Sequence, residues 1–310
     1  MKIHSNRAFT IEAPCKINLH LRILGKRPDG FHDLESIFAS LALSDLLKFE
    51  LDDRAGDCKL SLKWEIHEEI PERIPMEENL VFRALSLFRE KTGFNSGLRI
   101  ELVKRVPVKA GLGGGSSDAA STLMALNSLA KTHLSTEKLA EMALQLGSDV
   151  PFFLFGAAAF VSGRGEKIEP LALPDKGYLV LLVKPPFSSS TASAFRLLDQ
   201  FRESERKGFS DELRHLSLEG DPATWPFYND FLPAFLAKDS DNGPLYKHIL
   251  ETLKSSGASF IGLSGAGSTC FGIYHDEKTA KMAEKSLVGK GNFVRLTFFL
   301  ANKLNPVVEY

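Results

Sequence analysis

The first third of the chain alternates hydrophobic and polar residues with the period of two that is typical of half-buried β-strands. This alternation predicts strands at residues 9–24, 45–53 and 58–66, and the short interval between the last two predicts a hairpin. A further alternating stretch at residues 98–108 runs directly into a group of glycines. A strand is therefore expected to lead the chain into that glycine-rich segment.

Apolar residues recur at helical spacing in three segments of the same half: 79–93, 117–131 and 135–147. Gly93 and Gly147 stand where helices commonly end, because glycine adopts the backbone conformations of a helix C-terminus at little cost. Ser116 or Ser117 is the expected N-cap of the second helix, since a serine hydroxyl can accept a hydrogen bond from a first-turn N–H group. These segments predict a strand, a glycine-rich loop and a helix in direct succession.

The pattern changes character near residue 170, where a continuous apolar strand at residues 178–184 opens the second half. Helices are expected at 192–204, 227–237, 243–257 and 278–289, and strands at 258–265, 268–275 and 292–300. This order predicts an α+β protein with helices on one face of a mostly antiparallel sheet. We expect two domains, residues 1–170 and 171–310, and a solvent-facing helical insertion in the charged segment 201–220.

Composition and charge exclude several classes of protein. The 38 basic and 39 acidic residues give a formal net charge of −1, so no global field attracts nucleic acid or an anionic membrane. The three cysteines are far apart in the sequence and predict neither a disulfide framework nor a cysteine zinc site, and the histidine spacing predicts no zinc site. The longest apolar run, residues 152–161, is too short to span a bilayer. We expect a cytoplasmic monomer or weak homodimer.

Four glycines occupy residues 111–115, interrupted only by Leu112. Such a loop lets successive backbone N–H groups converge on an anion, and the helix behind it adds unpaired N–H donors and the positive end of its dipole. The familiar GxGxxG and GxxxxGK[ST] patterns do not fit, because Ser116 stands where a glycine is needed and the loop lacks the lysine. A tight turn is the alternative, but four glycines cost too much backbone entropy for that purpose alone. The loop therefore predicts a phosphate site.

The glycine-rich motif PVKAGLGGGSSDAA, residues 107–120, resembles the phosphate-binding signature of the GHMP kinases, the family of galactokinase, homoserine kinase and mevalonate kinase. LSGAGSTCF, residues 263–271, resembles the third motif of that family. Residues 13–38 and the motif GSDVPFF at residues 147–153 resemble the family members that act on 4-diphosphocytidyl-2-C-methyl-D-erythritol. The resemblance extends over nearly the whole chain and is weak only at residues 50–75 and 200–225.

The resemblance implies a fold and a reaction. The fold is a ribosomal-protein-S5-like N-terminal domain that binds ATP and a ferredoxin-like C-terminal domain, with the active site between them. The reaction is ATP-dependent phosphorylation of the 2-hydroxyl of the cytidine diphosphate substrate, in the non-mevalonate route to isoprenoids, with Mg²⁺ arriving with ATP. Two alternatives stay open: a GHMP kinase for another small alcohol such as homoserine or mevalonate, and a non-catalytic nucleotide-binding module.

The resemblance also assigns roles to two charged residues. Lys16 in PCKINL and Asp149 in GSDVP match the catalytic lysine and aspartate of the family. Asp149 is expected to accept the hydroxyl proton, and Lys16 to keep that carboxylate charged and to orient the acceptor. Without the resemblance, both residues look like ordinary solvated charges.

ATP is expected on the loop and on one neighbouring lysine. Ser116 or Ser117 is a candidate for contact with Mg²⁺, and Lys104 or Lys109 for contact with the phosphates. The residues expected at ATP are Lys104, Pro107, Val108, Lys109, Ala110, Gly111, Leu112, Gly113, Gly114, Gly115, Ser116 and Ser117.

The cytidine substrate is expected to contact aromatic and polar side chains from both halves. Phe31 and Phe195 can stack on the cytosine, while Asn18 and His32 supply polar contacts. Phe195 is also a candidate core residue, because the chain has 23 phenylalanines and most must be buried. Thr191 and Gly265 complete the expected substrate site.

Overall fold

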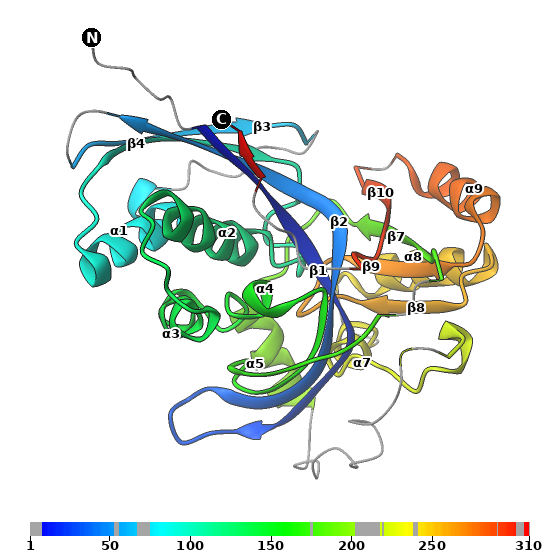
Figure 1. Cartoon of the computed structure of the whole chain (residues 1–310). Coiled ribbons are helices and arrows are strands. Elements are labelled where there is room, and N and C mark those ends of the chain that lie inside the picture. Colours follow the sequence, from blue (N-terminus) through cyan, green and yellow to red (C-terminus); the bar gives the residue numbers. More distant parts are fainter. Residues whose placement is uncertain are drawn as a thin grey trace.

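The structure is a computed structural model that describes residues 8–52, 56–66, 75–173, 176–201, 218, 220–237, 241–289, 291–301 and 307–309. Two sheets with helices packed against them make up this part of the chain (Figure 1). The α+β class predicted from the sequence is confirmed. The predicted charged insertion at 201–220 lies almost entirely outside the described residues.

The first sheet has seven strands and is antiparallel at every pairing except one. Its strands are β1 (Ala8–Lys26), β2 (His32–Asp52), β3 (Cys58–Trp64), β4 (Gly97–Lys104), β5 (Ala158–Gly163), β6 (Lys167–Pro170) and β11 (Val307–Glu309). Five of them follow the order β11–β1–β2–β4–β3, while β5 pairs with the other end of β2 and carries β6. The long strands β1 and β2 therefore pair in the middle of this sheet, and the shorter strands are added on either side of them (Figure 1).

The predicted hairpin between residues 45–53 and 58–66 is wrong, because β4 lies between the two strands. Leu46 of β2 pairs antiparallel with Val103 of β4, whose other edge pairs in parallel with β3. Burial explains the order: β4 is buried along most of its length, whereas β3 is largely exposed. The more apolar strand takes the central position and the more polar one takes the edge.

Helices cover one face of the first sheet and enclose its core. They are α1 (Leu80–Thr92), α2 (Gly114–Leu129), α3 (Thr136–Leu146) and α4 (Phe152–Phe155), preceded by a short 3₁₀ turn η1 (Met76–Glu78). Phe49, Phe88, Leu123 and Phe152 pack within this core. Gly93 ends α1 in the left-handed conformation, with φ of 72°, as the sequence predicts. We call the first sheet with α1–α4 the N-terminal unit.

The second sheet has four strands in the order β10–β7–β9–β8, all antiparallel. These strands are β7 (Leu179–Lys184), β8 (Phe260–Leu263), β9 (Cys270–Tyr274) and β10 (Phe293–Phe298). The accompanying helices are α5 (Thr191–Phe201), α7 (Phe231–Phe235), α8 (Gly243–Ser255) and α9 (Glu277–Leu287), with a 3₁₀ turn η2 (Pro222–Thr224). Within the described ranges, no helix combines the length and apolar character that crossing a bilayer requires. We call this sheet with its helices the C-terminal unit.

The long strand β1 joins the two units. Its Leu21 donates its N–H to the carbonyl of Tyr228 at 2.8 Å and accepts from the N–H of Asp230 at 2.9 Å. A shared core contains Ile17 from β1 and Leu182 from β7. The units are thus held together by backbone hydrogen bonds and by continuous apolar packing.

Candidate active site

A cavity of about 1100 Å³ opens between the two units. Its walls come from β1, β2, the segment between β4 and α2, the turn before α4, helix α5 and the segment after β8. Every residue that the sequence assigns to a site lines it, except Ser117: Lys16, Asn18, Phe31, His32, Lys104, residues 107–116, Asp149, Thr191, Phe195 and Gly265. Residues from four distant motifs thus meet in one cavity.

Two glycines of the loop have conformations and contacts that a side chain would disturb. Gly111 and Gly113 have φ values of 77° and 70°, in the left-handed region that disfavours other residues. A Cβ atom on Gly111 would lie 2.1 Å from the carbonyl oxygen of Ser264, and one on Gly113 would lie 3.0 Å from Cγ of Lys16. The glycines therefore let the loop approach both Lys16 and the third motif.

The helix after the loop begins earlier than predicted. Gly113 is the N-cap of α2 and no side chain caps this end, so the predicted serine N-cap is wrong. The physical reason is that Gly113 already provides the left-handed turn that starts the helix. The N–H groups of the first helical turn have no acceptor within a helix and need an outside partner. Since Gly114, Gly115 and Ser116 line the cavity, these donors are available to an anion there.

The two serines of the motif have different surroundings. Ser116 lines the cavity, whereas Ser117 is fully buried and lies outside the lining. The Ser117 N–H donates to the carbonyl of Gly113 at 2.9 Å, as the helix continues. Only Ser116 can offer its hydroxyl to a ligand in the cavity.

The third motif, residues 263–271, packs against the glycine loop. Ser264 donates its hydroxyl to the carbonyl of Gly111 at 2.8 Å, and the Thr269 N–H donates to the carbonyl of Ala110 at 3.2 Å. The C-terminal unit thus fixes the middle of a loop that the N-terminal unit carries.

Asn229 holds this third motif in place and was missed in the sequence. Its Nδ2 donates to the carbonyls of Leu263 and Gly265, each at 2.8 Å, while its Oδ1 accepts from the N–H of Phe231 at 2.9 Å. The side chain is buried. An isolated Asn between aromatic residues gives no sequence signal of such a role.

Lys16 and Asp149 form an ion pair in the cavity lining. The Lys16 Nζ lies 3.5 Å from Oδ2 of Asp149 and donates to Oδ1 of Asn18 at 2.6 Å. Lys16 is 3% exposed and Asp149 is 38% exposed. Burial lowers the pKa of Lys16 below its ordinary value, and the charge of Asp149 opposes that change. The arrangement places a solvent-accessible carboxylate beside a buried cation.

Three ring side chains, Phe31, His32 and Phe195, also line the cavity, and we call them the aromatic subsite. The rings of His32 and Phe195 stack with centroids 4.4 Å apart and an interplanar angle of 19°. Nε2 of His32 lies 3.0 Å from Oδ1 of Asp199. Half-exposed Phe31 has the Arg164 guanidinium 3.8 Å from its ring centroid. Asp199 and Arg164 carry no motif and were not identified from the sequence.

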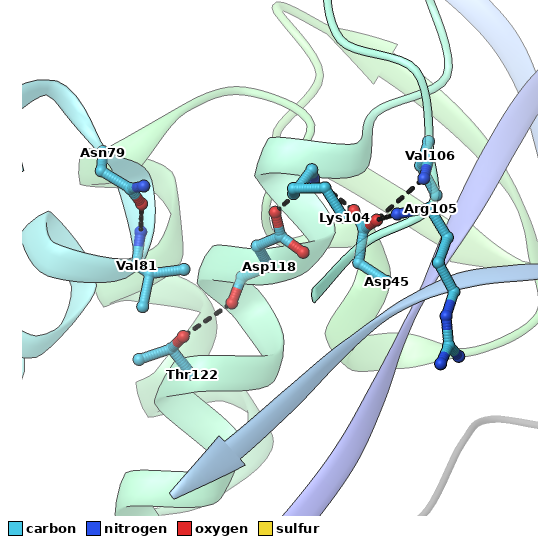
Figure 2. Close-up of polar contacts among 8 residues, drawn as sticks. All are labelled: Asp45, Asn79, Val81, Lys104, Arg105, Val106, Asp118 and Thr122. Carbon is cyan, nitrogen blue, oxygen red and sulfur yellow. Dashed lines mark hydrogen bonds and ion pairs between the residues drawn. The ribbon is translucent and has the colours of Figure 1, made fainter. Parts of the chain in front are cut away.

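Lys104 is held by two buried carboxylates (Figure 2). Its Nζ donates to Oδ2 of Asp118 at 2.8 Å and to Oδ2 of Asp45. Burial alone would lower the pKa of Lys104, but the two carboxylates outweigh burial and raise it. Burial pushes the pKa of Asp118 upward, and the attraction of Lys104 opposes that change. Lys109, in contrast, is exposed on the loop with φ of 51°.

Comparison with known proteins matches both halves of the chain to one family. The family models "GHMP kinases N terminal domain" and "GHMP kinases C terminal" match residues 79–157 and 240–291. The 4-diphosphocytidyl-2-C-methyl-D-erythritol kinase of Treponema pallidum (strain Nichols) is 36% identical over 291 residues, which cover 91% of this chain and 95% of that protein. The chain belongs to the GHMP kinase family. The resemblance inferred from the four motifs is confirmed.

Further relatives extend over the same length of this GHMP kinase. The 4-diphosphocytidyl-2-C-methyl-D-erythritol kinase of Thermodesulfovibrio yellowstonii is 37% identical over 91% of the chain and 95% of that protein. The crystal structure of a 4-(cytidine 5'-diphospho)-2C-methyl-D-erythritol kinase superimposes with a TM-score of 0.72 and 32% identity, covering 93% of this chain and 99% of the other. The two-domain GHMP kinase fold is thereby confirmed, and membership of this family implies an ATP-dependent small-molecule kinase.

Proposed function

We propose that this GHMP kinase transfers the γ-phosphoryl group of ATP to the 2-hydroxyl of 4-diphosphocytidyl-2-C-methyl-D-erythritol, a step in the non-mevalonate route to isoprenoids. The observation that carries the proposal is the Lys16–Asp149 pair, which faces the same cavity as the glycine loop. The names of the relatives, and their identity over nearly the whole chain, support this substrate.

The glycine loop supplies the ATP side of the site. Backbone N–H groups of residues 108–116, together with the free first turn of α2, would hold the triphosphate. Lys109 is the better placed of the two candidate lysines, since the Lys104 ammonium is already bound by carboxylates. ATP therefore meets mostly backbone dipoles, which suit a chain of phosphate oxygens.

Magnesium would enter with ATP. The described residues contain no group of three or more His, Cys, Asp or Glu side chains arranged to hold a metal. Mg²⁺ is commonly bound through substrate phosphates and very few protein oxygens. The Ser116 hydroxyl, which lines the cavity, would be such a protein oxygen. The ion would neutralise charge on the phosphate oxygens during transfer.

Asp149 and Lys16 supply the acceptor side. Phosphoryl transfer requires mainly alignment and charge neutralisation, and good alignment supplies roughly 7–11 kcal/mol. Asp149 would accept the proton of the attacking hydroxyl, while the Lys16 ammonium, 3.5 Å away, would orient the acceptor. Asn18, which binds the Lys16 ammonium, would orient the lysine toward Asp149.

The aromatic subsite would select the cytidine end of the substrate. Phe31, His32 and Phe195 offer flat faces and a polar ring in the cavity lining. Thr191 and Gly265 line the same cavity. In this proposal, residues 1–170 form the ATP-binding domain and residues 171–310 the second domain, although β11 of the second segment pairs with β1 in the first sheet, in a cytoplasmic monomer or weak homodimer.

A coupled assay of ADP release tests the proposal. The purified chain is offered the cytidine diphosphate substrate, homoserine and mevalonate in parallel, with ATP and Mg²⁺. We expect kcat/KM to be highest for the cytidine substrate. Faster release with homoserine or mevalonate would assign the chain to another GHMP kinase reaction, and no release with any acceptor would favour a nucleotide-binding module.

A further inference from the structure

Two buried carboxylates at the base of the glycine loop have no part in the proposed reaction. Asp45 belongs to β2 and Asp118 to α2, and both contact Lys104 at the end of β4 (Figure 2). Neither aspartate lines the cavity, and each is at most 4% exposed. Three elements of the N-terminal unit therefore meet at one cation directly before the loop begins. We call Asp45, Lys104 and Asp118 the loop-base cluster.

The loop-base cluster fixes the entrance of the loop through Asp45. Its Oδ1 accepts from the N–H groups of Arg105 and Val106, at 2.6 and 2.8 Å. These residues connect β4 to the glycine motif. With Oδ1 on the backbone and Oδ2 on Lys104, the carboxylate can adopt only one orientation. Charge-assisted hydrogen bonds of this kind are stronger than neutral ones.

The cluster fixes the exit of the loop through Asp118. This residue lies one turn into α2, so the Lys104–Asp118 ion pair joins the end of β4 to the start of the helix. The space between them is tightly filled, since a Cβ atom on Gly114 would lie 3.0 Å from Cγ1 of Val106 and 3.4 Å from Oδ2 of Asp45. Both ends of the loop are thus connected to the Lys104 ammonium, the entrance through Asp45 and the exit through Asp118.

We propose that Asp45 and Asp118 are positioning residues for phosphate binding, which act through Lys104 to hold the glycine loop with its N–H groups directed into the cavity. The proposal rests on the proposed function, in which this loop binds ATP. In this proposal Lys104 has a structural role, because it binds the two carboxylates at the base of the loop. The rival role for Lys104 is direct contact with the phosphates.

The two roles of Lys104 predict opposite results when its carboxylate partners are removed. Asp118→Ala deletes one partner, and Asp45→Asn keeps an oxygen for the backbone N–H groups but sets an amide group beside the ammonium. If Lys104 contacted the phosphates directly, either change would free its charge and strengthen ATP binding. If the cluster positions the loop, either change weakens ATP binding, because the loop loses a tie at one end.

The test measures KM for ATP and for the cytidine substrate, together with calorimetric binding of a non-hydrolysable ATP analogue with Mg²⁺. For Asp118→Ala and Asp45→Asn we expect KM for ATP and the analogue Kd to rise about tenfold or more, which corresponds to about 1.4 kcal/mol. KM for the cytidine substrate should stay within about twofold. Amide hydrogen exchange of the free protein should become faster across residues 105–116.

The matched control is Glu101→Gln, which removes a carboxylate that pairs with Lys48 and Lys63 on the more exposed side of β4. It should leave KM for ATP and the loop exchange unchanged. Tighter or unchanged analogue binding in Asp118→Ala would overturn the proposal. Should Asp45→Asn fail to fold, Asp118→Ala decides alone, and should both fail, Asp118→Asn, which removes the negative charge beside Lys104 and keeps the shape of the side chain, gives the same reading. A wild-type chain that binds no analogue would instead refute the proposed function.

Discussion

At the scale of residues, a buried cation pairs with a more accessible carboxylate. Lys16 is almost completely enclosed, while Asp149 remains accessible to an acceptor hydroxyl. Burial of an unpaired charge is costly, so the Lys16 ammonium is stabilised only as long as Asp149 and Asn18 accompany it. The pair is therefore coupled, and a change to either residue alters the other.

Asp149→Asn should reduce kcat by about 100-fold or more, because a positioned general base contributes about 10²- to 10⁴-fold. The Kd for an ATP analogue should stay nearly unchanged, since Asp149 belongs to the acceptor side of the cavity. Steady-state kinetics and calorimetry measure the two quantities. Asp33→Asn is the control, as it removes a similarly exposed carboxylate that pairs with Arg27. Wild-type turnover in Asp149→Asn would refute the assigned role.

His20 should make folding stability depend on acid pH. It is fully buried, its Nδ1 accepts from the N–H of Tyr228 at 3.2 Å, and burial, aided by the charge of Arg22, lowers its pKa to about 4. The unfolded chain binds the proton near pH 6.5, so stability is lost as the pH falls from about 6.5 to 4, by about 3 kcal/mol at most. Denaturant unfolding at pH 7, 5 and 4 measures this loss. His20→Asn, which keeps an acceptor without titrating, should lose less stability over the same range.

The sequence identifies the residues that line the cavity better than the residues that hold its loops in place. Lys16 and Asp149 lie in recognisable motifs, and the structure brings them together. Asp45 and Asn229 lie far in sequence from the loops they hold, and single polar residues show no pattern that identifies their partners. Their roles depend on tertiary contacts, which the sequence alone does not reveal.

At the scale of elements, the glycine loop is an example of backbone held between two units. Gly111→Ala should destabilise the fold by about 1–3 kcal/mol and weaken ATP-analogue binding, because the new Cβ atom would collide with the Ser264 carbonyl at a left-handed backbone position. Thermal unfolding and calorimetry test both effects. Gly115→Ala is the control for stability. Gly115 lies in helix α2, and its Cβ atom would lie at an ordinary contact distance of 3.5 Å from Cδ1 of Leu80 in α1. That control should be neutral or stabilising by up to about 1 kcal/mol.

Element types were predicted well and element neighbours less well. Periodicity identifies β1 and α1, and a continuous apolar run identifies β7, because apolar residues in these elements face a core. Pairing of β3 with β4 was missed because strand order depends on which strand is more buried, a property of the whole sheet. The start of α2 was missed because the helix begins within the glycines that the sequence assigns to a loop.

At the scale of the whole molecule, the aromatic part of the cavity is built by contacts between the two units. Phe195 of α5 stacks on His32 of β2, and its other neighbour is Phe231 of α7, at 5.0 Å between ring centroids. The residue thus faces both the cavity and the core, which accounts for the two interpretations that the sequence leaves open. The cavity would be incomplete in either unit alone.

Phe195→Ala should raise KM for the cytidine substrate about tenfold, because a stacked ring contributes roughly 1–3 kcal/mol per base. ATP-analogue binding should be spared, since the glycine loop lies elsewhere in the cavity. Kinetics with each substrate varied in turn separate the two. Phe201→Ala on the same helix, where the ring is half exposed, is the control. An unchanged KM in Phe195→Ala would assign this residue to the core alone.

The long ladder of β1 and β2 has a mechanical consequence. β1 has 19 residues and, at about 3.3 Å per residue, extends roughly 60 Å, carrying Lys16 in its middle and bonding Leu21 to the C-terminal unit. Domain closure usually bends a connector at a few residues. Here a swing of one unit would have to bend the β1–β2 ladder at its register shifts, which flank Lys16 and His20, or break the bonds of Leu21 to Tyr228 and Asp230. The spacing of the cavity walls therefore depends on this one ladder, and inserting one residue into β1 would misalign both walls together.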